Sequence, residues 1–465
     1  MARTKSITPE SLAALGAETL AEVLIAHAEV DPVLRKKLAM LLAGTAGPAK
    51  LAAEIEKRIK TIGRSRSFLE WDKVKPLVQE LDHLRATTAT RLAAQDRERA
   101  IALLWELLGI ADAVLDRVGD GTAAGEEVFG AAIADLGRLS AAPPPRDPVA
   151  LARRVLAVCE RDGFGSADAL IRHMGEALGP LGRASVRDAT AAALKSLPPA
   201  PGPNDWQVHT RRRRLGFRLA LLADLEGDPD AYIASIRAGA MENTHTLKVA
   251  ERLIAAGRAA EALTWLDKPR RHFADEGGQP VDLRIAALES LARGPEAQEV
   301  RWSHFATSLS AGHLGDYLRR LPDFEDFEAE QKALSLAAAH SEPDRALAFF
   351  IEWKALDRAD RLVRDRLSAL DGAAYDVLRP AAEALEEKFP EAASLLYRRT
   401  IESVLDRGSS SQYPYAARDL LSAARLAPRL PPKPGIETHA AFLAGLRKAH
   451  GGKYGFWGLI DPKGR

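Results

Sequence analysis

The sequence has almost no cysteine, which excludes several kinds of site. Cys159 is the one cysteine among 465 residues, so neither an internal disulfide nor a cysteine-based zinc cluster can form within the chain. It lies on the apolar face of a predicted helix, ALARRVLAVCERD, which favours a buried, unreactive thiol. A chain without disulfides is typical of a reducing compartment, and we expect a cytoplasmic protein.

Long hydrophobic runs are also lacking. The N-terminal MARTKSITPE has no apolar core of the kind that a signal peptide needs. The most hydrophobic stretch, residues 101–115, is interrupted by Glu106 and Asp112 and is too short to span a bilayer. We therefore expect no membrane association. The formal net charge of +1 argues against a chain-wide field for nucleic acid, so such a partner would need a local basic patch.

Recognisable catalytic and cofactor motifs are missing as well. The eleven histidines form no HxH or HExxH pair, and neither GxxxxGK[ST] nor GxSxG occurs. Gly163 and Gly165 match two glycines of a dinucleotide fingerprint, but they follow a predicted helix and the third position holds Asp168, which indicates a loop. We assign no catalytic, cofactor-binding or metal-ligating residue. An enzyme with a site assembled between the two halves stays open as a third alternative.

One segment partly matches a calcium-binding EF-hand loop. Positions 1, 5, 6 and 12 of such a loop would be Asp116, Asp120, Gly121 and Glu127. Val118 and Ala124 stand at positions 3 and 9, where oxygen ligands are needed. We therefore favour a connector between two helices, whose Asp and Thr residues cap the helix ends, over a calcium site.

The residues that are abundant favour helices. Aromatic residues make up only 6% of the chain, and Ala, Leu and Arg outnumber Val and Ile, so an all-α fold is expected. In residues 244–268, apolar positions recur at helical spacing, break at Gly257 and Arg258, and then resume. This pattern predicts two short amphipathic helices, each with a face that must be covered by a neighbour. We interpret the chain as a helical-repeat solenoid, similar to tetratricopeptide or HEAT arrays, with an N-terminal helical domain.

The repeats are diverged. GRAAEALTWL from Gly257, EPDRALAFFI from Glu342 and FPEAASLLYR from Phe389 share small residues followed by a large apolar cluster. Layers of roughly 40–47 residues would fit this spacing. Prolines at four positions each precede an apolar-periodic run, as proline does in the first turn of a helix. They are Pro229, Pro295, Pro343 and Pro390.

Proline-rich breaks suggest how the chain is divided. AAPPPRDP at 141–148, PPAPGPND at 198–205 and LPPKPG at 430–435 cannot lie inside helices. The resulting segments are an N-terminal helical domain at 1–140, a helical connector at 149–197, a repeat array at 206–427 and a C-terminal capping helix with an aromatic tail at 436–465. We expect the main boundary at 198–205.

Two clusters are candidates for partner binding. The first is the basic run Arg211, Arg212, Arg213 and Arg214. It could hold phosphate, nucleic acid or an acidic protein segment, because arginine forks match such groups, or it could be a solvated helix start paired with nearby acids. The second is the tail with Tyr454, Phe456 and Trp457. It could protrude as a recognition segment, although we favour a cap on the last helical layer.

A second basic stretch runs through residues 57–75, with Phe68 and Trp71 in its course. The two aromatic rings could stack on bases, but at helical spacing a place in the core is favoured. Its basic residues are Lys57, Arg58, Lys60, Arg64, Arg66, Lys73 and Lys75.

Several segments together resemble an uncharacterised bacterial family of long helical proteins. They are RIKTIGRSRSFLEW, DPDAYIASIRAGAMEN, AGRAAEALTWLDK, YPYAARDLLSAARLA and HGGKYGFWGLI. The repeat half is similar to the helical region that accompanies SWIM-type zinc-binding domains. The resemblance implies a helical fold; the CxC…CxH zinc set itself is absent from this sequence.

These observations predict a non-enzymatic helical-repeat scaffold that binds a protein along the 206–427 array. The alternative is a nucleic-acid-associated protein that uses the local basic patches. Salt separates the two, because binding to phosphates weakens steeply as ionic strength rises. The oligomeric state is left open.

Overall fold

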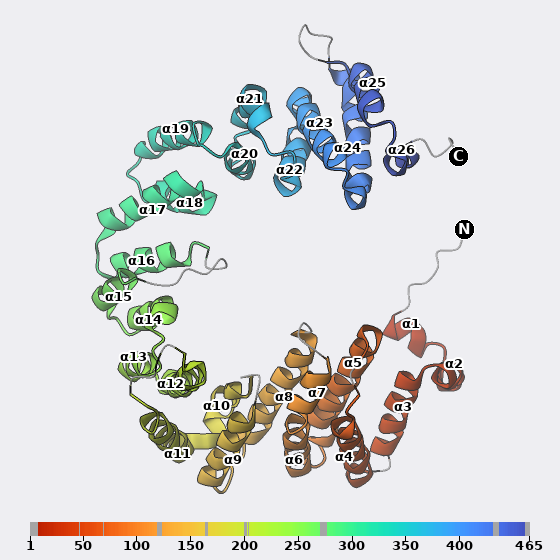
Figure 1. The fold of residues 1–465 in the computed structure, drawn as a ribbon, viewed down its shortest axis with the longest axis vertical. Helices are drawn as coiled ribbons and strands as arrows, with labels where there is room; N and C mark the ends of the chain where they lie inside the picture. Colours follow the sequence, from red (N-terminus) through yellow and green to blue (C-terminus); the bar gives the residue numbers. More distant parts are fainter. Residues whose placement is uncertain are drawn as a thin grey trace. The chain divides into compact units, whose positions relative to one another are not determined.

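The computed structural model describes residues 8–45, 47–67, 69–118, 123–162, 166–199, 202, 204–269, 277–430 and 437–460. Within these ranges the chain forms 26 α-helices, five short turns of other helical pitch and no β-strand (Figure 1). The predicted all-α fold is confirmed. None of the helices so described is long and apolar enough to cross a membrane. Contacts divide the chain into two compact units, residues 1–249 with 269–271 and residues 250–268 with 272–465; the predicted four-part division stays a prediction.

The first unit contains thirteen helices and most of a fourteenth among its described residues. They are α1 (Pro9–Ala13), α2 (Ala17–Val30), α3 (Pro32–Thr45), α4 (Pro48–Arg64), α5 (Trp71–Thr87), α6 (Arg97–Leu108), α7 (Ala111–Val118), α8 (Ala123–Ala141), α9 (Pro148–Arg161), α10 (Ala169–His173), α11 (Gly175–Lys195), α12 (Trp206–Glu226), α13 (Pro229–Ala238) and α14 (Glu242–Ala255).

Periodic apolar residues account for these helices. In α4, Leu51, Ile55, Ile59 and Ile62 share one face and are all buried, as the sequence predicts. The apolar stretch at 101–115 belongs to two helices, because α6 ends at Leu108 and α7 begins at Ala111. Apolar periodicity alone does not reveal such a short break.

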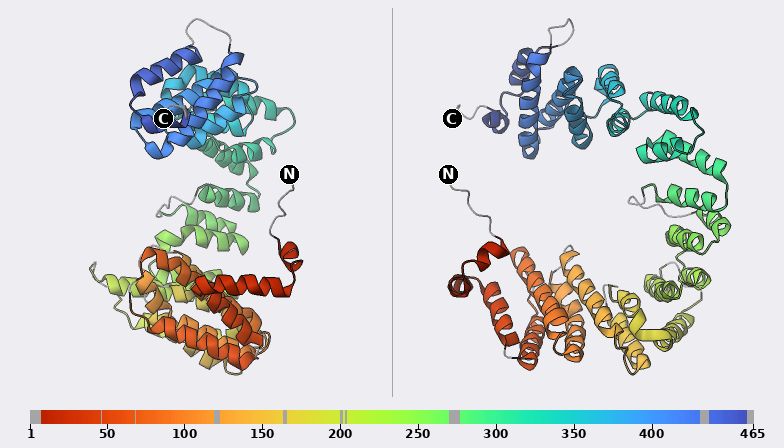
Figure 2. Two further views of the ribbon diagram at one scale, coloured as in Figure 1. Left: turned by 90° about the vertical axis from the view of Figure 1, so that its right-hand side faces the viewer. Right: turned by 180° about the vertical axis from the view of Figure 1, so that it is seen from behind.

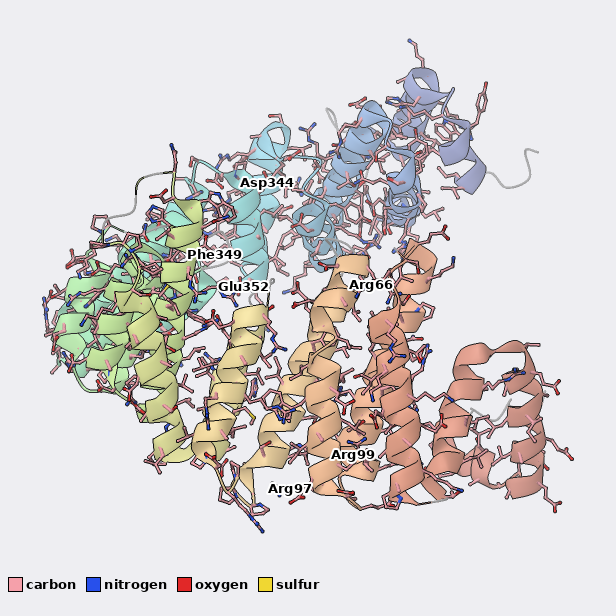
Figure 3. The ribbon with its side chains drawn as sticks, turned by 60° about the horizontal axis from the view of Figure 1, so that its bottom comes forward. Arg66, Arg97, Arg99, Asp344, Phe349 and Glu352 are labelled. Carbon is pink, nitrogen blue, oxygen red and sulfur yellow. The ribbon has the colours of Figure 1, made fainter. Side chains whose placement is uncertain are left out.

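Arginine side chains tie these helices together. The Arg97 guanidinium donates through Nε to the carbonyl oxygen of Leu139 at 2.7 Å, near the C-terminal end of α8, where carbonyls lack helical partners (Figure 3). Arg99 forms an ion pair with Glu56 of α4 (Figure 3). At the crossing of α12 and α13, a Cβ on Gly216 would lie 2.5 Å from the Cα of Gly239, so glycine is required there for the two helices to approach this closely.

The described part of the second unit contains the end of α14 and twelve further helices. They are α15 (Ala259–Leu266), α16 (Gln279–Ser290), α17 (Gly294–Ser308), α18 (Ala311–Leu318), α19 (Glu325–Ala338), α20 (Pro343–Glu352), α21 (Leu356–Arg366), α22 (Tyr375–Leu385), α23 (Pro390–Arg407), α24 (Tyr413–Leu426), α25 (His439–His450) and α26 (Tyr454–Ile460).

Helices that follow one another in sequence pack against one another in this unit (Figure 2). The pairs α16 and α17, α20 and α21, α22 and α23, and α23 and α24 are in contact. The expected helix starts at Pro295, Pro343 and Pro390 are confirmed, with proline in the first turn of α17, α20 and α23. Phe349 lies in the core of this unit, with its ring centroid 5.3 Å from that of Phe305 (Figure 3).

Candidate functional site

The basic run of α12 is turned largely toward the protein itself. Arg214 donates through Nη1 to the carbonyl oxygen of Asp162 at 2.9 Å and through Nη2 to that of Cys159 at 3.1 Å. One helical turn later Arg218, which is 2% exposed, donates through Nε to Asp168 at 2.7 Å and pairs with Glu160. These arginines hold the C-terminal end of α9, whose carbonyls need donors. The partner-binding role predicted for the run stays a prediction.

The other members of the run differ in their surroundings. Arg211 lies 2.8 Å from a carboxylate oxygen of Glu160, and Arg212 donates to the carbonyl oxygen of Pro198. Arg213 is exposed and makes no hydrogen bond or ion pair with any described residue. Among the four predicted arginines, Arg213 is therefore the one with an unoccupied guanidinium.

Cys159 lies beside this arginine cluster and is buried, as predicted. Burial and the neighbouring Asp168 carboxylate raise the pKa of its thiol to about 12. The thiol therefore stays protonated at neutral pH, which makes it a poor nucleophile.

Three of the seven basic residues of the second stretch, Arg58, Lys60 and Lys73, are paired locally. Arg58 of α4 donates through Nη2 to Glu80 of α5 at 2.8 Å, and Lys73 lies 3.2 Å from Glu70. Phe68 lies outside the described residues, as do Asp120 and Gly121 of the EF-hand match and the two glycines of the 163–165 loop. The predictions that rest on those residues stay predictions.

The aromatic tail forms helix α26, which packs on α24. Phe456 is fully buried, with its ring 5.0 Å from that of Trp457 and 6.0 Å from that of Tyr413. Trp457 donates through its indole N–H to the carbonyl oxygen of His450 at 2.9 Å. Tyr454, in contrast, is 82% exposed. Two of the three predicted tail residues thus contact their own chain, while Tyr454 is free to contact a partner.

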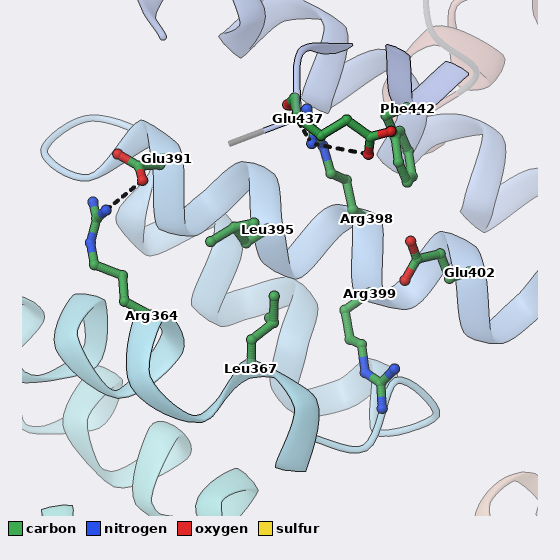
Figure 4. A pocket seen from close by; sticks show the side chains of 9 residues that line it. All are labelled: Arg364, Leu367, Glu391, Leu395, Arg398, Arg399, Glu402, Glu437 and Phe442. Atoms are coloured by element: carbon green, nitrogen blue, oxygen red, sulfur yellow. Dashed lines mark hydrogen bonds and ion pairs between the residues drawn. The ribbon is translucent and has the colours of Figure 1, made fainter. Parts of the chain in front are cut away.

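One pocket of the second unit lies against α23 and has a volume of about 420 Å³ (Figure 4). We refer to it as the α23 pocket. Helix α23 begins with Pro390 in its first turn and ends at Gly408, which adopts the left-handed conformation that glycine tolerates best. The lining residues come from α21, the turn that follows it, α23 and the beginning of α25. They are Arg364, Leu367, Glu391, Leu395, Arg398, Arg399, Glu402, Glu437 and Phe442.

Arg398 is the unusual member of the α23 pocket. It is 7% exposed, and its guanidinium lies 4.8 Å from the ring centroid of Phe442. Its Nη1 donates to the backbone carbonyl oxygen of Glu437 at 2.8 Å, but the Glu437 carboxylate is 3.9 Å away and Nε has no hydrogen-bond partner among the described residues. Burial lowers the pKa of Arg398, although Glu437 and Glu402 oppose that shift. A buried cation with a vacant donor is costly unless something completes its hydrogen bonds.

The neighbouring charged groups complete the electrostatics of the α23 pocket. Arg399 uses Nε on the carbonyl oxygen of Leu370 at 3.0 Å, while its two terminal nitrogens have no hydrogen-bond partner among the described residues. Burial raises the pKa of the Glu402 carboxyl. Arg364 is engaged with Glu391 at 2.5 Å (Figure 4). Unused arginine donors and an under-solvated carboxyl therefore lie in the lining of one cavity.

This arrangement suits an anion of single charge. Arginine forks match carboxylates and phosphates, and a buried arginine strengthens such contacts. The pocket lining, however, contains three arginines and three glutamates. Glutamates would repel a doubly charged phosphate more than a carboxylate. Leu367, Leu395 and Phe442 add apolar surface beside the donors, as in pockets that hold organic groups.

Sequence reasoning missed this pocket. Glu391, Leu395, Arg398 and Glu402 recur at intervals of three and four residues, so their shared helical face is visible in the sequence. The burial of Arg398 is not visible there, because Glu437 and Phe442 approach it from a segment about forty residues further along the chain.

Comparisons with known proteins place the chain in a family but assign no activity. No curated protein and no solved structure gives a significant match. No match links the chain to SWIM-type proteins, so that expected likeness is not supported. A family model, in contrast, matches residues 2–459. The chain belongs to this family of unknown function, DUF6880.

Proposed function

We propose that the chain is a non-enzymatic helical-repeat scaffold that holds a partner protein, and that the α23 pocket anchors a carboxylate of that partner. Packing between successive helices supports the repeat interpretation, since each helix of a solenoid needs its neighbours to cover its apolar face. The single observation that carries the proposal is Arg398, a buried cation in the lining of an open pocket whose nearest carboxylate, that of Glu437, is 3.9 Å away.

A carboxylate in the α23 pocket would accept hydrogen bonds from the terminal nitrogens of Arg399, and the buried charge of Arg398 would attract it. An apolar side chain next to it would contact Leu367, Leu395 and Phe442. A peptide can supply such a carboxylate from its C-terminus or from an aspartate or glutamate side chain. The binding energy would be concentrated at this anchor, with weaker contacts spread along neighbouring helices.

The test is a pull-down from native lysate with the full chain, in parallel with Arg398→Met and Arg153→Met. Arg153→Met is the matched control, because that side chain is exposed on α9 and makes no hydrogen bond or ion pair with a described residue. We expect a specific protein to be recovered by the wild type and the control and lost with Arg398→Met. Removing one member of a buried charged contact should weaken binding by about 30-fold or more.

A second arm identifies the source of the carboxylate. Fragments of the recovered partner are synthesised with a free or an amidated C-terminus, and with acidic side chains replaced by amides, and their affinities are measured by fluorescence polarisation. Loss of binding on amidation indicates the C-terminus, and loss on side-chain replacement indicates an internal acid. Equal binding of all forms to wild type and Arg398→Met would contradict the proposal.

The nucleic-acid alternative is examined by the same pull-down with nuclease. The internal pairing of Arg211, Arg212 and Arg214 leaves this alternative with little support. Recovery that disappears with nuclease and falls steeply with salt would favour it over the scaffold.

A further inference from the structure

The N-terminal helices expose an unusual amount of apolar surface. Seven of the sixteen large apolar side chains that are exposed in the described part of the chain lie within α1, α2, α3 and the turn between α1 and α2. We call them the hairpin surface. They are Leu12, Leu15, Val23, Leu24, Ile25, Val30 and Leu42. Isolated exposed apolar residues are common, but a group confined to one short segment indicates an interface.

Helix α2 is the clearest case, because none of its fourteen residues is buried. The helix packs against α3, and α3 packs in turn on α4. An isolated helix of this length is only marginally stable in water, so its apolar face must be covered to hold it. By comparison, α4 buries five residues against its own unit.

The distribution of residues around α2 shows that one neighbouring helix is not enough to cover its apolar surface. Glu18, Glu22 and Glu29 lie on one narrow strip of the helix, while its apolar residues occupy more than half of the circumference. A surface helix with one packing partner needs an apolar stripe only a little wider than ~100°. Val23 and Val30, separated by two helical turns, therefore form a second face that α3 leaves exposed.

We propose that the hairpin surface is a self-association site, at which α2 and α3 of one chain pack against α2 and α3 of a second copy. Both helices contain fourteen residues, so two such hairpins can form a four-helix bundle with matched ends. A two-fold pairing uses the same surface on both copies, which the hairpin permits.

The charges of α2 and α3 favour a dimer in which α2 of one copy packs against α3 of the other. Helix α2 contains three glutamates and no lysine or arginine, whereas α3 contains Arg35 with two lysines and no acid. Packing α2 against α3 of the other copy brings opposite charges together twice, while packing α2 against α2 brings acids together. The pairing of unlike helices is therefore preferred.

The area is also adequate for a dimer. The five side chains of the hairpin surface that lie on α2 and α3 are between 40% and 79% exposed. At roughly 150–180 Å² for a fully exposed aliphatic residue, they amount to about 500 Å² of apolar surface per chain. A standard interface buries about 800 Å² per partner, of which about 65% is apolar in homodimers. These five side chains supply nearly all of that apolar area.

The experiment measures the mass of the full chain in solution by analytical ultracentrifugation from about 0.1 to 50 µM, a range that covers ordinary dimer affinities. The wild type is expected to approach twice the chain mass of 50.3 kDa. The variant Val23→Lys/Val30→Lys places four charges in the proposed interface and should weaken the dimer by ~100-fold or more. Both valines are exposed in the single chain. The circular dichroism spectrum of this variant and the melting of its helices α4–α12 should therefore match those of the wild type.

Leu181→Lys is the matched control, since Leu181 is an equally exposed aliphatic residue on α11. This variant should dimerise like the wild type. A wild type that stays monomeric up to 50 µM overturns the proposal and indicates a different protein or another segment as the occupant. A dimer that survives Val23→Lys/Val30→Lys, or one that Leu181→Lys dissociates, also overturns it. The outcome is independent of the α23 pocket, whose variants leave the hairpin unchanged.

Discussion

Arg218 in the first unit and Arg398 in the second are both buried, yet their surroundings differ. Arg218 donates to Asp168, Glu160 and the carbonyl oxygen of Cys159. Although burial opposes it, these partners raise the pKa of Arg218. Within the described part of the chain Arg398 has one hydrogen bond, to the carbonyl oxygen of Glu437, and burial lowers its pKa.

The difference indicates different roles for the two side chains. Removing one partner of a buried ion pair strongly lowers the free energy of unfolding, because the other charge is left uncompensated. A buried cation whose charge is poorly compensated contributes little to folding, and its charge can attract an anionic ligand. Arg218 should therefore matter for stability, and Arg398 for binding.

The largest effect should come from Arg218→Met. This change leaves the buried Asp168 carboxylate without its closest donor, and the expected loss is about 3–5 kcal/mol in the unfolding free energy of the first unit. Urea unfolding followed by circular dichroism measures it. Arg213→Met, on the same helix but exposed, should change stability by less than about 0.5 kcal/mol. Equal effects of the two substitutions would remove the distinction between them.

Phe456→Ala should have the next largest effect, about 3 kcal/mol. In the second unit the helices near Arg398 are held by apolar contacts, and Phe456 is fully buried in the cluster that includes Phe442 and Leu446. Tyr454→Ala is the control, because Tyr454 belongs to the same short helix but is exposed. Melting curves compare the two. If both variants melt like the wild type, α26 is not a stabilising cap.

How much of this could be predicted from sequence depends on the range of the interaction. The starts of α20 and α23 follow from Pro343 and Pro390 and from the apolar residues that come after them. The four-arginine run was visible as charge, but the partners of Arg214 lie more than fifty residues away. Local patterns cannot reveal such pairing.

The candidate site and the hairpin surface both show that burial cannot be predicted from local sequence, and the errors have opposite directions. Arg398 looks like a solvated residue in the sequence, and only the packing of α25 buries it. The apolar residues of α2 look like core positions, and only the absence of a second neighbour leaves them exposed. Helical periodicity predicts that a face needs covering; it does not identify what covers it.

Asp419 offers a test of under-compensated charge near the α23 pocket. It is 0% exposed, accepts a hydrogen bond from Thr400 at 2.9 Å, and lies 3.7 Å from Arg379. Burial raises the pKa of its carboxyl to about 6. The folded chain therefore binds more protons than the unfolded chain between about pH 4 and 6, and the stability contributed by Asp419 is lost as the pH rises through that range.

Asp419→Asn should consequently stabilise the second unit relative to the wild type, and more so at pH 8 than at pH 4. The difference between the two chains should grow by roughly 1–3 kcal/mol over that interval. Urea unfolding at both pH values measures it. Asp357→Asn on the surface of α21 is the control. A constant difference between wild type and Asp419→Asn would show that Asp419 stays ionised in the folded chain.

The smallest effect on stability is expected from Arg398→Met. This variant tests most directly whether Arg398 differs in role from Arg218. Methionine keeps the apolar contact with Phe442 and removes a poorly compensated buried charge, while one hydrogen bond to Glu437 is lost. These contributions oppose one another, so the change should stay within about 1 kcal/mol and could be stabilising. A loss of 3 kcal/mol or more would mean that Arg398 is a structural residue like Arg218 and that its charge is not held in reserve for a ligand.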